Sequence, residues 1–149
     1  MMGEEETGLG DAVFFVAPAV LAAIFTAVPL ENMLSEFPFQ HVFPWYPPWR
    51  GALVSFLLWI IAGLILSEKR PWSKLFFAGS AASFIVYHYL MLFETVATGH
   101  PVAVYPLFYT VGRSPPIIDL AQIVAILTVL ALKKDVSELA KKWGLWKTT

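Results

Sequence analysis

Apolar residues form four long runs along the chain, and nearly all charged residues lie outside them. The runs cover about residues 12–30, 51–67, 75–98 and 117–134. A helix rises about 1.5 Å per residue, so roughly 20 apolar residues cross the hydrocarbon core of a bilayer, which is about 30 Å thick. The first two runs also lack the polar face that a helix of a soluble bundle needs. The pattern predicts an all-α integral membrane protein, with residues 1–149 forming one four-transmembrane-helix bundle.

Two further segments have the spacing of amphipathic helices. In residues 134–147 the apolar side chains recur at helical spacing, while most lysines lie on the other face. Residues 29–37 show the same separation, and Pro29 suits a first helical turn. Such helices lie in the plane of the membrane interface. We therefore expect interfacial helices over both segments, the second of them forming a C-terminal surface helix.

The connections after the first and third runs are rich in aromatic residues and proline. Residues 37–50 read FPFQHVFPWYPPWR, and residues 100–114 read HPVAVYPLFYTVGRS. Proline fixes φ and disfavours a helical conformation in the residue before it, which predicts extended and stiff backbone. Irregular backbone is excluded from the lipid-exposed hydrocarbon region. We expect these two loops to form an apolar lid over one mouth of the bundle.

The composition agrees with a membrane location and excludes several other classes. Of the residues, 58% are hydrophobic and 14% are charged, against about 45–50% and 25% in ordinary soluble domains. Hydrophobicity of this kind excludes a disordered chain. The absence of cysteine excludes disulfide scaffolds, thiolate metal sites and thiol nucleophiles. A net charge of −1 without a basic patch argues against a nucleic-acid partner.

The positions of lysine and arginine predict the orientation. With four crossings, both termini and the loop between the second and third runs share one side of the membrane. That side carries eight of the ten basic residues: Lys69, Arg70, Lys74, Lys133, Lys134, Lys141, Lys142 and Lys147. The other side carries Arg50 and Arg113. By the positive-inside rule, we expect a multi-pass protein of the cell membrane with both termini cytoplasmic.

Polar residues gather near the outer ends of the predicted crossings. Ionisable groups at membrane depth are costly and usually face a cavity, a partner or each other. The candidate residues for a pocket beneath the lid are Glu94, Asp119, His88, Tyr87, Gln122, Arg50, Arg113, Trp45 and Trp49. The same residues could instead form structural salt bridges, for example between Arg50 and either Asp119 or Glu94. Small residues at 78–83 predict close helix packing in the third run.

No metal or cofactor site is predicted. His41, His88, His100 and Glu94 have no chelating spacing along the chain. The sequence also contains no recognisable nucleophile and base pair and no glycine-rich phosphate loop.

These observations leave several functions open. The first is a non-catalytic binding or accessory module that holds a lipid or an apolar small molecule, or that docks in a larger membrane complex. Membrane lipid is the expected partner, with a homo-oligomer as a further possibility. The second is an oligomeric small transporter with Glu94, Asp119 or His88 as coupling groups, since a short chain encloses a path only as an oligomer. The third is an intramembrane lipid-modifying enzyme with His88 and Glu94 as acid and base.

Overall fold

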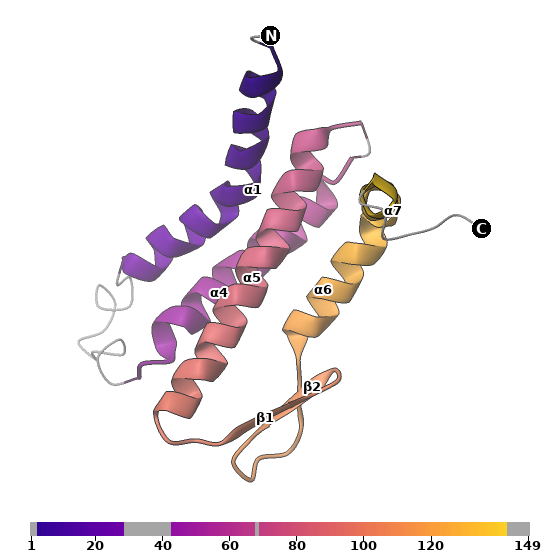
Figure 1. The fold of residues 1–149 in the computed structure, drawn as a ribbon. Coiled ribbons are helices and arrows are strands. Elements are labelled where there is room, and N and C mark those ends of the chain that lie inside the picture. Colours follow the sequence, from indigo (N-terminus) through magenta and orange to yellow (C-terminus); the bar gives the residue numbers. More distant parts are fainter. Residues whose placement is uncertain (1–2, 29–42, 68, 143–149) are drawn as a thin grey trace.

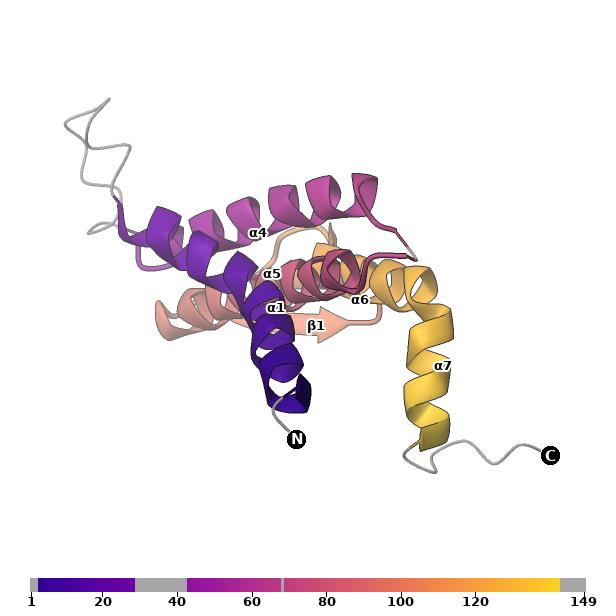
Figure 2. The ribbon, with the colours of Figure 1, turned by 90° about the horizontal axis from the view of Figure 1, so that it is seen from above.

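The computed structural model describes residues 3–28, 43–67 and 69–142 (Figure 1). The elements are α1 (Gly3–Ala27), α4 (Tyr46–Leu64), α5 (Pro71–Ala97), β1 (Val102–Tyr105), β2 (Phe108–Val111), β3 (Ile117–Ile118), α6 (Leu120–Ala131) and α7 (Lys133–Lys142). α5 lies at the centre, packed against α1 and α4 on one side and against α6 on another (Figure 2). The start of α1, the turn between α4 and α5, and α7 lie at one end, and the strands lie at the other (Figure 1).

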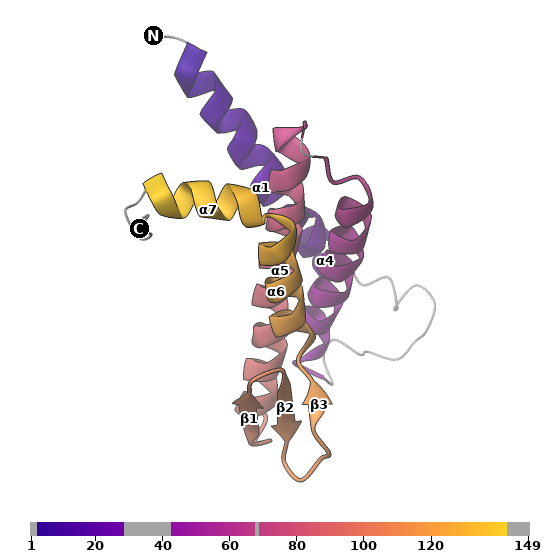
Figure 3. The ribbon, with the colours of Figure 1, turned by 90° about the vertical axis from the view of Figure 1, so that its right-hand side faces the viewer.

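Three of the helices are long and apolar enough to cross a membrane. They contain the segments Gly10–Ala27, Tyr46–Leu64 and Pro71–Ala97. This confirms the first three predicted runs as helices of membrane length. α6 has 12 residues and therefore rises only about 18 Å. The fourth run forms a shorter helix than its expected extent of 117–134, because Asp119 caps its start and α7 turns away after Leu132 (Figure 3).

The end of the first proline-rich loop is helical, which corrects the expectation of extended backbone up to residue 50. α4 begins at Tyr46, and Pro47 and Pro48 follow within its first turn. Proline is accepted there because the N–H groups of a first helical turn have no partner within the helix. Residues 37–42 of that loop and the expected interfacial helix at 29–37 lie outside the described residues.

The second proline-rich loop is not irregular, so the all-α expectation is wrong in this segment. β1 and β2 pair as an antiparallel hairpin with Tyr105 opposite Phe108, and β3 pairs with β2 through Phe108 and Ile118. Valine, tyrosine, phenylalanine and isoleucine favour strands. Because the strands pair with one another, this apolar segment satisfies much of its own backbone hydrogen bonding.

The core lies where α4, α5 and α6 meet. Its buried members include Ala52, Phe84 and Val124, one from each helix. Hydrogen bonds add specificity within this core: the hydroxyls of Ser55 and Ser83 lie 2.8 Å apart, and Trp59 Nε1 donates to Thr128 Oγ1 at 2.9 Å. α5 also approaches α1 so closely that a Cβ atom at Gly79 would overlap the backbone carbonyl of Phe15. Small residues in α5 therefore allow close packing, as the run at 78–83 predicts.

Candidate functional site

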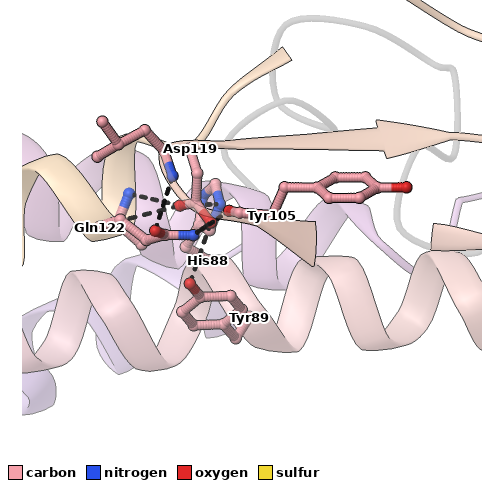
Figure 4. A network of polar contacts seen from close by, with 7 residues as sticks. His88, Tyr89, Tyr105, Asp119 and Gln122 are labelled. Carbon is pink, nitrogen blue, oxygen red and sulfur yellow. Dashed lines mark hydrogen bonds and ion pairs between the residues drawn. The ribbon is translucent and has the colours of Figure 1, made fainter. Parts of the chain in front are cut away.

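Asp119 is the centre of a buried polar cluster at the sheet end of the bundle. Its side chain is fully buried and caps the N-terminus of α6. Oδ1 accepts hydrogen bonds from the backbone N–H groups of Ala121 at 3.0 Å and Gln122 at 3.2 Å. Oδ2 accepts from the Tyr89 hydroxyl at 3.0 Å and from Gln122 Nε2 at 2.9 Å (Figure 4). These four donors replace the water that the carboxylate loses on burial.

Gln122 connects this cluster to the β-hairpin. Its Nε2 donates to the carbonyl oxygen of Tyr105 at 2.8 Å, and its Oε1 accepts from the backbone N–H of Leu107 at 2.9 Å. The N–H of Asp119 donates to the carbonyl of Leu107 at 2.9 Å. Leu107 has φ of 68°, a left-handed conformation that is unfavourable for residues other than glycine. These hydrogen bonds hold the strained turn in place.

His88 extends from α5 toward the same carboxylate. Its side chain is 8% exposed, and Nε2 lies 3.4 Å from Asp119 Oδ1. Within the described part of the chain, Nε2 has no hydrogen-bond partner. The imidazole lies edge-to-face against the rings of Tyr89 and Tyr109, at centroid distances of 5.5 and 5.8 Å. The sheet thus covers His88 from one side through Tyr109.

An apolar cleft of about 270 Å³ adjoins this cluster. We call it the His88 cleft. Its wall includes Trp49, Leu53 and Phe56 of α4, Phe84, His88 and Met91 of α5, Tyr109 of β2, and Ile117 and Ile118 of β3. At its rim, Leu53 and Ile118 are 44% and 63% exposed. The cleft therefore opens through apolar side chains to the surroundings of the bundle.

Tyr109 contributes a neutral phenol to the cleft wall. It belongs to β2, outside the helices of membrane length. Burial, and after it the negative charge of Asp119, raises the pKa of Tyr109 above its ordinary value. The phenol therefore keeps its proton at neutral pH.

Arg50 does not belong to this cluster. It is buried near the start of α4, and its Nη2 donates to the carbonyl oxygens of Phe25 and, at 2.6 Å, Val28. These carbonyls lie at the C-terminal end of α1 and immediately beyond it, where backbone acceptors lack partners within the helix. The alternative interpretation, an ion pair of Arg50 with Asp119 or Glu94, is therefore not found among the described residues: the guanidinium binds the end of α1.

Four other candidate residues also lie apart from Asp119. Glu94 is half-buried further along α5, and within the described ranges its carboxylate makes no hydrogen bond or ion pair. The Tyr87 ring packs against Gly51 of α4. Arg113 is exposed just after β2, and Trp45 packs against Phe43 and Tyr46 beside the start of α4. Of the nine candidates, the structure brings together His88, Asp119, Gln122 and, across the cleft, Trp49.

Sequence reasoning missed Tyr89, Tyr109 and the turn at Leu107. Tyr89 has a detectable signal, because it continues the helical spacing of the core residues Ala81 and Ile85 on α5. Tyr109 and Leu107 depend on the hairpin, which the sequence analysis did not expect.

The cluster offers few ligands for a metal ion. Across the described residues, no three histidine, aspartate or glutamate side chains lie close enough to hold one. The centre supplies one imidazole and one carboxylate, and that carboxylate already accepts four hydrogen bonds.

Comparisons with models of known protein families, with curated proteins and with solved structures find no match to this chain. The geometry of the His88 cleft and of the polar cluster beside it therefore provides the evidence for its function.

Proposed function

We propose that this protein is a membrane-embedded binding module that holds an apolar molecule drawn from the bilayer, a lipid or an apolar small molecule, in the His88 cleft. The observation that carries this proposal is an apolar cleft next to a buried polar cluster, with a rim of exposed apolar side chains. Small-molecule sites are typically concave and apolar, with a few polar groups that fix orientation. The exposed rim at Leu53 and Ile118 provides lateral entry from lipid.

The proposal includes a topology of four crossings, with α6 as the short fourth. α6 runs back alongside α5, so the N-terminus and α7 lie at the same end of the bundle (Figure 1). Lysine and arginine are concentrated at that end, including Lys69, Arg70 and Lys133. The positive-inside rule then places both termini in the cytoplasm and the sheet outside the cell membrane.

Binding is favoured over catalysis by the state of the carboxylate. Both oxygens of Asp119 are fully engaged as acceptors, which leaves no free lone pair for proton abstraction. A transporter coupled through Glu94, Asp119 and His88 together has less support, because Glu94 lies apart from the other two. The partner in this proposal is membrane lipid, and association into a homo-oligomer or a larger complex is compatible with it.

A cleft-filling variant tests the proposal. Leu53→Trp places a large side chain at the mouth of the cleft. Leu57→Trp places it one turn further along the same helix, at a leucine that is 50% exposed and does not line the His88 cleft. Native mass spectrometry from mild detergent measures the co-purifying small molecule. We expect retention in the native protein and in Leu57→Trp, and loss in Leu53→Trp. Equal retention in both variants would contradict the proposal.

A further inference from the structure

The orientation of His88 determines which hydrogen-bonding group the cleft wall presents to a bound molecule. Nε2 is turned toward the carboxylate of Asp119. The negative charge of a carboxylate beside one ring nitrogen favours the proton on that nitrogen, even without a hydrogen bond between them. In a neutral imidazole the other nitrogen is then a hydrogen-bond acceptor. That nitrogen is Nδ1: of the two ring nitrogens only Nε2 is fully buried without a hydrogen bond to any described residue, and the His88 ring forms part of the cleft wall.

The charge behind the imidazole restricts the occupant further. Both oxygens of Asp119 act only as acceptors, which is the pattern of an ionised carboxylate. In low-dielectric surroundings a second negative charge close to it is strongly unfavourable. The cleft therefore disfavours the carboxylate of a fatty acid and the phosphate of a phospholipid, and it favours a neutral group that donates a hydrogen bond.

The shape of the cleft favours a flat head with a chain attached. Aromatic rings of Trp49, Phe56, Phe84 and Tyr109 contribute to its wall, and such rings pack well against another ring. The volume of about 270 Å³ is just below the roughly 300–1,000 Å³ of typical ligand pockets. It is suited to a head group, while a chain would leave over the exposed rim.

We infer that the occupant is a neutral amphiphile whose ring head carries a hydroxyl group. The hydroxyl donates to Nδ1 of His88, the ring packs among the aromatic side chains, and the apolar chain passes over Leu53 and Ile118 into the bilayer. Asp119 is a positioning residue here, because it sets the tautomer of His88 without touching the occupant. This inference rests on the proposed function and adds the chemical class of the ligand.

A matched series of probes tests the head group. The full-length protein in lipid nanodiscs is titrated by calorimetry with para-nonylphenol, its methyl ether and para-nonylbenzoate. The methyl ether keeps the ring and the chain but cannot donate, and the benzoate is anionic. We expect the phenol to bind about tenfold more tightly than the ether, the equivalent of one hydrogen bond, and the benzoate to bind more weakly than the phenol.

The variant His88→Phe keeps an aromatic ring and removes the acceptor. We expect it to bind the phenol as weakly as the ether, with the affinity for the ether unchanged. If His88→Phe does not fold, the three affinities of the native protein still decide the question. Equal affinities for phenol and ether, or tightest binding of the benzoate, would overturn the inference.

The failures of the two proposals can be told apart with Leu53→Trp. If phenol and ether bind equally and Leu53→Trp abolishes both, the binding module stands and the head-group inference is wrong. If none of the probes binds to the native protein but the co-purifying molecule is retained there and lost in Leu53→Trp, the head-group inference alone is wrong; if no molecule is retained either, both proposals are wrong.

Discussion

Asp119 joins three parts of the molecule through one side chain. It caps α6, it accepts a hydrogen bond from Tyr89 of α5, and its neighbour Gln122 holds the hairpin turn at Tyr105 and Leu107. Buried polar groups with full hydrogen bonding stabilise a unique arrangement, whereas one unmatched group is costly. The register of α6 against α5 therefore depends on this carboxylate.

Substitution of Asp119 tests this dependence. Asp119→Ala leaves the N–H groups of α6 and the Tyr89 hydroxyl without their acceptor, so we expect the free energy of unfolding to fall by about 2–4 kcal/mol. Asp119→Asn keeps one acceptor oxygen, so its free energy of unfolding should fall by less than that of the alanine variant. Denaturant unfolding in detergent, followed by circular dichroism, measures both variants. An alanine variant as stable as the asparagine variant would contradict the role of the cap.

Leu107 is a strained residue, and its replacement by glycine should increase the stability of the protein. Its φ of 68° costs a residue with a side chain about 1–2 kcal/mol, and glycine adopts this conformation without strain. Glycine also loses more entropy on folding, so we expect Leu107→Gly to raise the free energy of unfolding by about 0.5–1 kcal/mol. Leu107→Ala is the control, because it removes the side chain but keeps the strain. A gain in the alanine variant equal to that in the glycine variant would contradict the strain argument.

The sequence predicts which residues share a helix face but not which face meets which neighbour. Asp119 and Gln122 lie three residues apart, which is the spacing of neighbours on a helix, and their side chains do meet. Tyr87 and Glu94 also lie at helical spacing, yet the rotation of α5 turns Tyr87 toward Gly51 and Tyr89 toward Asp119. The rotation of a helix about its axis is determined by packing against other helices, so it cannot be predicted from the sequence of that helix alone.

At the scale of elements, the apolar runs predict that the helices exist, whereas individual residues at the ends of the runs determine where each helix begins and ends. Pro47 and Pro48 read as breakers, but they are accepted in the first turn of α4. Likewise Pro101 precedes β1, and Pro106 occupies the hairpin turn. Proline is compatible with a strand boundary or a turn as well as with an irregular loop. The strands near these prolines are too short for their apolar periodicity to distinguish a β-hairpin from an irregular loop.

The contact of α5 with α1 predicts a sensitive glycine. In Gly79→Ala the new methyl group would overlap the carbonyl of Phe15, and a backbone atom cannot move aside as a side chain can. We expect a loss of roughly 1–3 kcal/mol from overpacking, measured by thermal unfolding in detergent. Gly10→Ala in α1 is the control, because its methyl group meets nothing within 4 Å. Equal stability of the two variants would mean that α1 is not packed against α5 as described.

The whole molecule has two chemically different ends. The end with α7 carries lysines, one of which, Lys74 of α5, forms a 2.7 Å ion pair with Asp135 of α7. The other end carries the sheet (Figure 3). Within the sheet, Val104, Tyr105 and Ile118 are exposed. Basic residues favour the cytoplasmic side and aromatic residues favour the interface. The shape and the charge of the bundle are thus consistent with the same orientation.

Cysteine labelling tests this orientation, because the native chain contains no cysteine. Single variants Arg113→Cys near the sheet, Lys69→Cys in the turn before α5 and Glu138→Cys in α7 replace exposed residues. With an impermeant thiol reagent on intact cells, we expect only Arg113→Cys to react. Permeabilised cells provide the control, since all three variants should then react. Labelling of both Arg113→Cys and Glu138→Cys in intact cells would show that α6 does not cross, whereas labelling of Lys69→Cys and Glu138→Cys without Arg113→Cys would show the inverted orientation.

The difference in length between α5 and α6 has a consequence for the bilayer itself. The 27 residues of α5 rise about 40 Å, whereas the 12 residues of α6 rise about 18 Å. If α6 is the fourth crossing, as proposed, lipid beside it must thin to match its length, and each ångström of hydrophobic mismatch costs a fraction of a kcal/mol. We expect a higher unfolding temperature in short-chain than in long-chain phosphatidylcholine bilayers, and the reverse order would contradict α6 as a crossing. A protein with this asymmetry would sort into thinner membranes and draw a locally compressed, loosely ordered patch of lipid to the side where the His88 cleft opens.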